Sequence, residues 1–441
     1  MKARLFACCL FLTLFFLTPL AFSYQFNFTP RASVSEEYTD NVFLSDNNKK
    51  DDFITIVSAG FAAQLLGKSS GLELSYDPAR TIYIEFDERN TWRHAAQLVG
   101  WKEIEKHTRL EFADYFLRSE DPLSEEDIFI NETDLLVGAD PTIRRDRRTF
   151  YTNTARARIS HQFGADDQIY AEYLYSILRN NASDIQDNDR HSPSIGLNYW
   201  FTNLFGLESR FAYTRGEYDE GSDLTGDDIT DFNDWSGTLR LIRKISRTFS
   251  VFGQHDQIYR DFDDDGDNDY MVYAPSVGLQ YAIEKNLVFR LGGGYFYQSI
   301  DDDDDEDGFF VNAEIDKTWD YRRGSINLRG SSGLDRQDFG AENLGFERFA
   351  GIQASADYSF TRTLVGDING YYRYADVIEQ NSDRKDHRFR AGAGLSYLPT
   401  RWMTLTLSYE YNRFDSNENE DYEENRVLLR VTLQPHLPWR F

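Results

Sequence analysis

Hydrophobic and polar residues alternate one by one along many short stretches of this chain. The segment 403–411, with the sequence M-T-L-T-L-S-Y-E-Y, shows the pattern clearly. Its apolar side chains stand at every second position, and side chains alternate between two faces along a β-strand. An amphipathic helix needs apolar residues three to four positions apart, and that spacing is missing here. The alternation recurs at 207–214 and 427–434, so the pattern predicts β-strands with one apolar and one polar face.

Short turn signals divide the chain into hairpins of about 40 residues each, which is long enough for two membrane-crossing strands and a loop. They lie near Gly67, Glu105, Gly164, Thr202, Ser246, Glu284, Asp320, Thr361 and Pro399. Nine such turns separate ten hairpins, which predicts about 20 strands, with 18 as the alternative count. One hairpin is longer because it contains an extended loop from Glu120 to Arg147. An even strand number places both termini on one side, as bacterial barrels require.

The segments opposite the short turns are longer and mostly acidic, as at Glu217 to Asp231, Ile300 to Gly308, Glu379 to Asp386 and Asp415 to Glu424. Transmembrane barrels combine short periplasmic turns with long extracellular loops. A soluble β-sandwich would also explain the alternation, but it would not explain this two-sided difference between the connections. The sequence therefore predicts an all-β fold, namely a transmembrane antiparallel β-barrel with short periplasmic turns and long acidic extracellular loops.

The overall composition fits a barrel and excludes some functions. The mean hydropathy is −0.58 and 41% of the 441 residues are hydrophobic. A barrel needs apolar residues only at alternate positions, so low hydropathy does not argue against it. The net charge of −27 argues against nucleic acid as a partner. The two cysteines, Cys8 and Cys9, lie near the N-terminus, so we expect no disulfide or thiolate metal site in the mature chain.

The first 23 residues have the features of a secretory signal peptide. Lys2 and Arg4 precede an apolar stretch at 5–20, and Ala21-Phe22-Ser23 fits a cleavage site. A membrane anchor is the alternative, but the apolar run is short for a spanning helix. We therefore expect residues 1–23 to direct export across the inner membrane, and residues 24–441 to form one barrel domain in the cell outer membrane.

The first predicted hairpin carries the only segment with a specific family resemblance. It reads T-P-R-A-S-V-S-E-E-Y-T-D-N at 29–41 and D-D-F-I-T-I-V-S-A-G-F at 51–61. Here the chain resembles the β-barrel porins associated with exopolysaccharide and PEP-CTERM gene clusters. The resemblance implies an outer-membrane barrel, the outer part of a polysaccharide exporter, with polysaccharide export components as partners. It supplies no catalytic residues.

Other expected partners follow from the C-terminus and the location. The terminal Phe441 is similar to the signal that the barrel-assembly machinery reads, although Pro435 and Pro438 depart from that pattern. An outer-membrane barrel also contacts outer-membrane lipid and lipopolysaccharide.

If the apolar face of each strand meets lipid, the alternate face lines the lumen. This places charged residues of both signs inside the barrel, where water or a partner makes them tolerable. The predicted lumen-lining residues are Arg156, Arg158, Arg210, Arg240, Arg290, Arg329, Arg373, Arg390, Arg430, Glu73, Glu172, Glu208, Asp367 and Glu410. They predict a polar conduit whose guanidinium groups guide a solute. The alternative is a ladder of ion pairs that holds a closed, side-chain-filled wall.

One acidic loop has the spacing of a weak calcium site. Asp261, Asp263, Asp265, Asp267 and Asp269 alternate around Gly266, like the opening of a calcium-binding loop. Val272 stands where such a loop needs its last glutamate, and no helices flank the segment. A solvated acidic loop is the alternative. Weakly bound calcium is the one cofactor that the sequence predicts.

No catalytic motif surrounds any of the seven histidines. We therefore predict a porin-like conduit, not an enzyme, for exported exopolysaccharide or small hydrophilic solutes. A non-transporting surface barrel whose acidic loops bind a partner or divalent cations is the second hypothesis. An outer-membrane hydrolase is the third.

Overall fold

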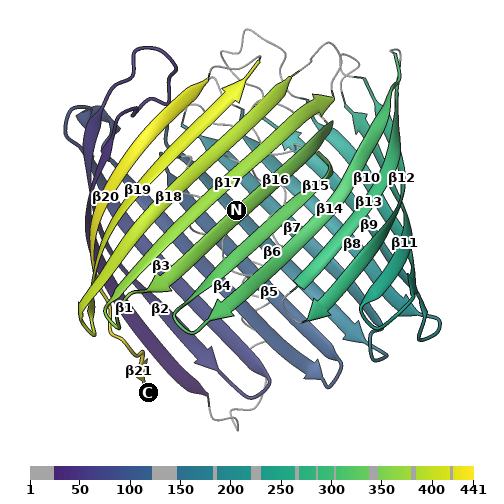
Figure 1. Cartoon of the computed structure of the whole chain (residues 1–441), viewed down its shortest axis with the longest axis horizontal. Coiled ribbons are helices and arrows are strands. Elements are labelled where there is room, and N and C mark those ends of the chain that lie inside the picture. Colours follow the sequence, from purple (N-terminus) through teal and green to yellow (C-terminus); the bar gives the residue numbers. More distant parts are fainter. Residues whose placement is uncertain are drawn as a thin grey trace.

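The computed structural model describes residues 24–121, 147–181, 186–219, 230–263, 268–284, 287–301, 304–336, 346–378, 384–417 and 421–441. These residues form one antiparallel sheet that closes into a barrel, because β1 pairs with both β2 and β20 (Figure 1). The predicted signal peptide lies outside the described residues.

Twenty long strands form the wall, so the predicted count is confirmed. The first ten are β1 (Gln25–Thr39), β2 (Asp52–Leu66), β3 (Ser70–Tyr83), β4 (Thr91–Glu105), β5 (Thr108–Ser119), β6 (Phe150–Gln162), β7 (Gln168–Asn180), β8 (Asn188–Trp200), β9 (Phe205–Tyr218) and β10 (Phe232–Lys244). The others are β11 (Phe249–Phe262), β12 (Tyr270–Glu284), β13 (Leu287–Ile300), β14 (Glu306–Tyr321), β15 (Gly324–Arg336), β16 (Phe346–Ser359), β17 (Leu364–Ile378), β18 (Lys385–Thr400), β19 (Met403–Ser416) and β20 (Tyr422–Leu433).

Apolar side chains cover the outside of this wall. Val34, Phe211 and Leu429 are exposed by 51%, 51% and 54%, while polar neighbours such as Glu37 and Thr214 are buried. The register keeps this alternation continuous around the barrel, including the closing pair, where Val34 lies opposite Val431. A band of exposed apolar residues that encircles the wall is what a lipid environment requires.

The connections differ at the two ends, as the loop lengths predict. The turn between β4 and β5 contains only 106–107, whereas the connection between β5 and β6 spans 120–149. The first and last described residues, Tyr24 and Phe441, lie at the short-turn end, where β21 (Trp439–Arg440) pairs with Phe28 and Asn27 at the start of β1. The short-turn end is therefore periplasmic and the long-loop end extracellular.

Several strands extend further into the acidic segments than the sequence predicts. β14 begins at Glu306 and β18 at Lys385, both inside segments predicted to be loop. Cross-strand bonds help to hold these residues in the sheet. The Tyr295 hydroxyl, for example, donates a hydrogen bond to the carboxylate of Asp307. A polar partner on the next strand thus outweighs the low strand propensity of aspartate.

The inner face is not polar throughout. Tyr270, Val272, Phe296, Phe310 and Phe346 form a buried apolar cluster from β12, β13, β14 and β16. They lie near the extracellular ends of these strands. This side of the barrel therefore has its own small core.

Among the residues placed by the structure, no helix is long and apolar enough to cross a membrane. The helical element described is a short 3-10 turn, η1 (Asp87–Arg89).

Candidate functional site on the inner wall and at the mouth

The fourteen residues predicted to line the lumen all lie at positions that alternate with the exposed apolar residues. On β9, for example, Glu208 and Arg210 alternate with the outward Phe211, and on β15 Arg329 alternates with the outward Ile326. This placement puts them on the inner face of the wall. Their part in guiding a solute stays a prediction.

Most of the inward arginines lie beside a carboxylate on an adjacent or nearby strand. The pairs are Arg156–Glu172 (2.6 Å), Arg158–Glu172 (3.8 Å), Arg210–Glu172 (3.9 Å), Arg240–Glu208 (3.1 Å), Arg290–Glu314, Arg329–Asp316 (3.3 Å), Arg373–Glu347 and Arg390–Glu410 (4.0 Å). Glu73 instead accepts a hydrogen bond from Gln64 at 3.0 Å. The inner face thus carries much of the ion-pair ladder that the closed-wall alternative requires.

The exposure of these pairs varies strongly around the barrel. The Arg156 and Arg373 side chains are each 14% exposed, whereas Arg210 is 57% and Arg329 is 69% exposed. Inward charges that keep most of their surface accessible are not packed against neighbouring side chains. The wall around β9 and β15 is therefore open to the lumen.

Two predicted lumen residues have no ion-pair partner within the described part of the chain. Arg430 of β20 and Asp367 of β17 make no salt bridge or side-chain hydrogen bond there. An unpaired charge on the inner face of a membrane barrel depends on water for its solvation.

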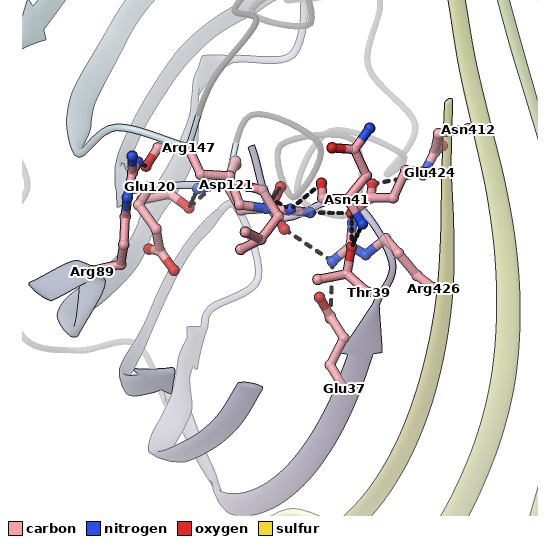
Figure 2. A network of polar contacts seen from close by, with 12 residues as sticks. Glu37, Thr39, Asn41, Arg89, Glu120, Asp121, Arg147, Asn412, Glu424 and Arg426 are labelled. Atoms are coloured by element: carbon pink, nitrogen blue, oxygen red, sulfur yellow. Dashed lines mark hydrogen bonds and ion pairs between the residues drawn. The ribbon is translucent and has the colours of Figure 1, made fainter. Parts of the chain in front are cut away.

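A buried polar network closes one side of the extracellular mouth (Figure 2). Its centre is Arg147, which precedes β6 and is 1% exposed. The guanidinium donates to Glu424 Oε1 at 2.5 Å and to the backbone carbonyl of Val42 at 3.1 Å. Glu424 also accepts a 2.5 Å hydrogen bond from the Thr39 hydroxyl. These contacts attach the chain just before β6 to β1 and β20.

The other end of the β5–β6 connection enters the same network. Asp121 lies 2.9 Å from Arg426 Nη2, and Arg426 is also 2.9 Å from Glu37. Glu120 binds Arg93 of β4 at 2.7 Å and accepts a hydrogen bond from the Tyr83 hydroxyl at 3.1 Å. Both described ends of the connection are therefore fixed to the inner wall.

The charges in this network stabilise one another strongly. Burial alone lowers the pKa of Arg147, but attraction to the carboxylates of Glu424 and Asp121 more than offsets it, so the pKa is raised and the guanidinium stays charged. Three guanidinium groups, on Arg93, Arg147 and Arg426, lie within ion-pair distance of five carboxylates, on Glu37, Glu120, Asp121, Glu410 and Glu424. Removal of one member would leave a buried charge without compensation.

The sequence interpretation did not single out the arginines of the mouth. Arg93 and Arg426 lie at inward positions of β4 and β20, so the alternation could have found both. The same holds for Arg31, which pairs with Asp77, and for the buried Arg260–Asp234 pair at 2.9 Å. Arg147 lies outside the strands, and no periodic signal marks it.

The structure describes three of the five predicted calcium ligands, Asp261, Asp263 and Asp269. Asp265 and Asp267 lie outside the described residues. Asp263 forms two 2.8 Å hydrogen bonds with Arg215, and these bonds hold the pKa of its carboxyl below the usual value. Asp269 accepts a hydrogen bond from the backbone of Phe262, although burial raises its pKa. Within the described segments, no group of three or more candidate ligands could hold a metal ion. Calcium binding here stays a prediction.

A closed antiparallel barrel with an apolar outer band and a charged inner wall is the architecture of an outer-membrane porin. Sequence comparison gives the family: residues 209–435, just over half of the chain, match the family described as putative beta-barrel porin 2. The chain belongs to this family, and the protein is a porin-like barrel of the outer membrane. No curated protein matches the sequence.

The chain also matches solved structures of outer-membrane proteins at low sequence identity. Pseudomonas aeruginosa OccK2 (OpdF), solved in complex with glucuronate, is 13% identical with a TM-score of 0.40, and the match covers 93% of this chain and 98% of that chain. Acinetobacter baumannii OccAB4 is 13% identical with a TM-score of 0.40, over 95% of this chain and 100% of that chain. Pseudomonas aeruginosa OpdO is 14% identical with a TM-score of 0.39, and the match covers 92% of this chain and 97% of that chain.

Proposed function

We propose that the barrel conducts hydrophilic saccharides with carboxylate or hydroxyl groups, and that exported polysaccharide is its cargo. The observation that carries this proposal is the exposure of inward guanidinium groups, above all the 69% exposed Arg329. A wall built only as a closed ladder of pairs would bury these groups.

The inner face of β15 supports the same conclusion. Asn327, Arg329 and Ser331 follow one another at alternate positions and are all exposed. Amides, hydroxyls and guanidinium groups supply the hydrogen bonds by which polar solutes are held. The planar guanidinium of arginine binds carboxylates and sugar hydroxyls in a fixed geometry better than lysine does.

The histidines give no support to a hydrolase. His94, His191 and His387 lie on outward positions, where each ring is within 2.6–2.9 Å of a tyrosine hydroxyl on the next strand. These are interfacial positions on the lipid side of the wall. A hydrolytic centre in the lumen would need such groups on the inner face.

The test is single-channel recording of the purified barrel in planar bilayers. We expect stable conductance that is blocked more strongly by an acidic oligosaccharide, such as an oligogalacturonate, than by a neutral oligosaccharide of equal length. Arg329→Ser should weaken this preference, because it removes an exposed cation from the pathway. Arg413→Ser, on the outer face, is the matched control and should behave like the wild type. A barrel that inserts but does not conduct would reject the conduit and favour the surface-binding hypothesis.

A further inference from the structure

The outer face near the extracellular ends of β3, β4 and β5 carries two arginines. Arg80 lies between Val57 of β2 and Trp92 of β4, and Arg118 lies between His94 of β4 and Tyr151 of β6. All of these positions alternate with buried inward residues such as Thr81 and Leu117. Two half-buried cations therefore lie on the lipid-facing side of the barrel.

These two arginines differ from other outward arginines at this end. Arg179 pairs with Asp187 and Asp189, Arg215 pairs with Asp231 and Asp263, and Arg413 pairs with Asp415. Arg80 and Arg118 have no carboxylate within ion-pair distance among the described residues. In a chain with net charge −27, this local excess of positive charge calls for an anion from outside the protein.

Aromatic rings join the two arginines into one surface. The Arg80 guanidinium lies 5.7 Å from the centre of the Trp92 ring, and Trp92 stacks with His94 at 6.4 Å. The Tyr76 hydroxyl is 2.8 Å from His94 Nδ1. Exposed apolar groups surround this surface, with Trp92 at 50% and Val57 at 44% exposure. Aromatic residues of this kind anchor barrels at the membrane interface.

The surface lies at the level of lipid headgroups. Arg80 is three residues from the end of β3, and Arg118 is one residue from the end of β5. A tilted strand of this length rises roughly 35 Å, against an apolar band of about 25 Å, so its last residues extend into the headgroup layer. The outward carboxylate of Asp114 lies four residues further along β5 toward the periplasm and accepts a hydrogen bond from Asn153 at 3.0 Å.

The rim directly above this surface is also cationic. A polar cavity of 560 Å³ is lined by Arg89, Arg118, Arg147 and Arg148, together with Glu88 and Glu120. Arg118 thus connects the lipid-facing surface with a polar hollow above it. A ligand with acyl chains below and anionic groups above would fit this arrangement.

We propose that Arg80 and Arg118 bind the phosphate groups of lipopolysaccharide in the outer leaflet. The planar guanidinium groups form paired hydrogen bonds with phosphate oxygens, and the surrounding aromatic and apolar side chains contact the acyl chains. A free phosphate ion would use only the arginines, whereas the exposed apolar rim favours an amphipathic ligand. This site does not depend on conduction through the lumen.

The test measures binding of bis-phosphorylated lipid A to the detergent-folded barrel by native mass spectrometry. We expect the double variant Arg80→Gln, Arg118→Gln to bind at least tenfold more weakly than the wild type, the change expected when phosphate hydrogen bonds from charged donors are lost. Arg413→Gln is the control and should keep wild-type affinity. Lipid A stripped of its phosphates should bind the wild type as weakly as intact lipid A binds the double variant.

Three results would overturn the proposal. The first is equal affinity of the wild type and the double variant for lipid A. The second is equal binding of lipid A with and without its phosphates. The third is displacement of lipid A by millimolar inorganic phosphate, because that would indicate a site for soluble anions. Heat-modifiable gel mobility verifies that each variant is folded. If the glutamine variant does not fold, Arg80→Lys, Arg118→Lys keeps the charge. Loss of the paired hydrogen bonds should still weaken its binding, and unchanged binding would reject the site.

Discussion

Arg147 and Glu424 are joined by a 2.5 Å ion pair although 277 positions separate them in the sequence. Both side chains are almost completely buried at the mouth. The pair links the long β5–β6 connection to the last long strand of the barrel, next to the seam where β20 meets β1. The stability of the β1–β20 seam is therefore coupled to the position of the described ends of the β5–β6 connection.

Loss of either partner at the mouth should destabilise the barrel strongly. Arg147→Met and Glu424→Gln should each lower the free energy of unfolding by about 3–5 kcal/mol, because each leaves a buried charge uncompensated. The double variant should lose less than the sum of the two. Urea titration of the heat-modifiable folded form measures all three. The exposed Arg413–Asp415 pair is the control, and Arg413→Met should change stability by less than about 1 kcal/mol. Strict additivity of the two mouth substitutions would contradict the coupling.

Charges on the inner wall should set ion selectivity. Replacing Arg290 and Arg329 together by Ser should shift the reversal potential in a salt gradient toward cation selectivity, since two positive charges leave the pathway. Asp316→Asn should shift the reversal potential toward anion selectivity, because this substitution leaves Arg329 without its partner. Little loss of thermal stability is expected for Arg329→Ser alone, given the 69% exposure of this side chain. Conductance with unchanged selectivity would remove these residues from the mechanism.

Gly60 should be intolerant of a side chain. It lies opposite Arg31, and a Cβ at this position would come within 2.2 Å of Asp77 Oδ1 and 2.5 Å of the backbone carbonyl of Tyr76. Gly60→Ala should therefore cost about 1–3 kcal/mol through overpacking. At Gly253 a Cβ would meet nothing within 4 Å, so Gly253→Ala is the control and should be neutral or slightly stabilising. Equal melting temperatures for the two variants would refute the close approach.

If the 261–269 loop binds calcium, Arg215 should compete with it. Arg215 already binds the Asp263 carboxylate, so Arg215→Gln should free a ligand and strengthen calcium binding. Isothermal calorimetry should show the strongest calcium binding for Arg215→Gln, weaker binding for the wild type, and the weakest for the double variant Asp263→Ala, Asp265→Ala. We expect wild-type dissociation constants of ~10⁻⁴–10⁻³ M, as in extracellular sites. Identical heats in all three would rule out a specific site.

The Arg215–Asp263 pair also predicts a pH dependence. Hydrogen bonds from Arg215 lower the pKa of Asp263, so the folded state binds its proton less readily than the unfolded state. The stability from this pair is present above the unfolded-state pKa of about 4, and it is lost as the pH falls through the lower folded-state value. Arg215→Gln should therefore reduce the melting temperature slightly at pH 7, and the difference from the wild type should shrink as the pH falls below about 4. A difference that persists at acidic pH would have another origin.

Local sequence alone determined the strands, their faces and their number. The alternation of apolar and polar residues fixes which side of each strand meets lipid, because a strand has only two faces. The short turns fix the hairpins, and an even number of strands fixes the relative position of the termini. The inward placement of residues such as Arg210 and Arg329 followed from this rule alone.

Only the tertiary structure decided which charges meet and which remain exposed. Arg210 and Arg156 have the same periodic signal, yet one is 57% and the other 14% exposed, because curvature and neighbouring strands set the space around each side chain. The ion pair of Arg147 with Glu424 depends on closure of β1 against β20 and on a segment without periodicity. The apolar cluster around Phe296 occupies inward positions of β12 to β14, where alternation predicts polar residues, and it forms only because long-range packing brings Tyr270, Phe296 and Phe310 together with Phe346 of β16. Local pattern thus sets the face of a residue, and long-range packing sets its partners.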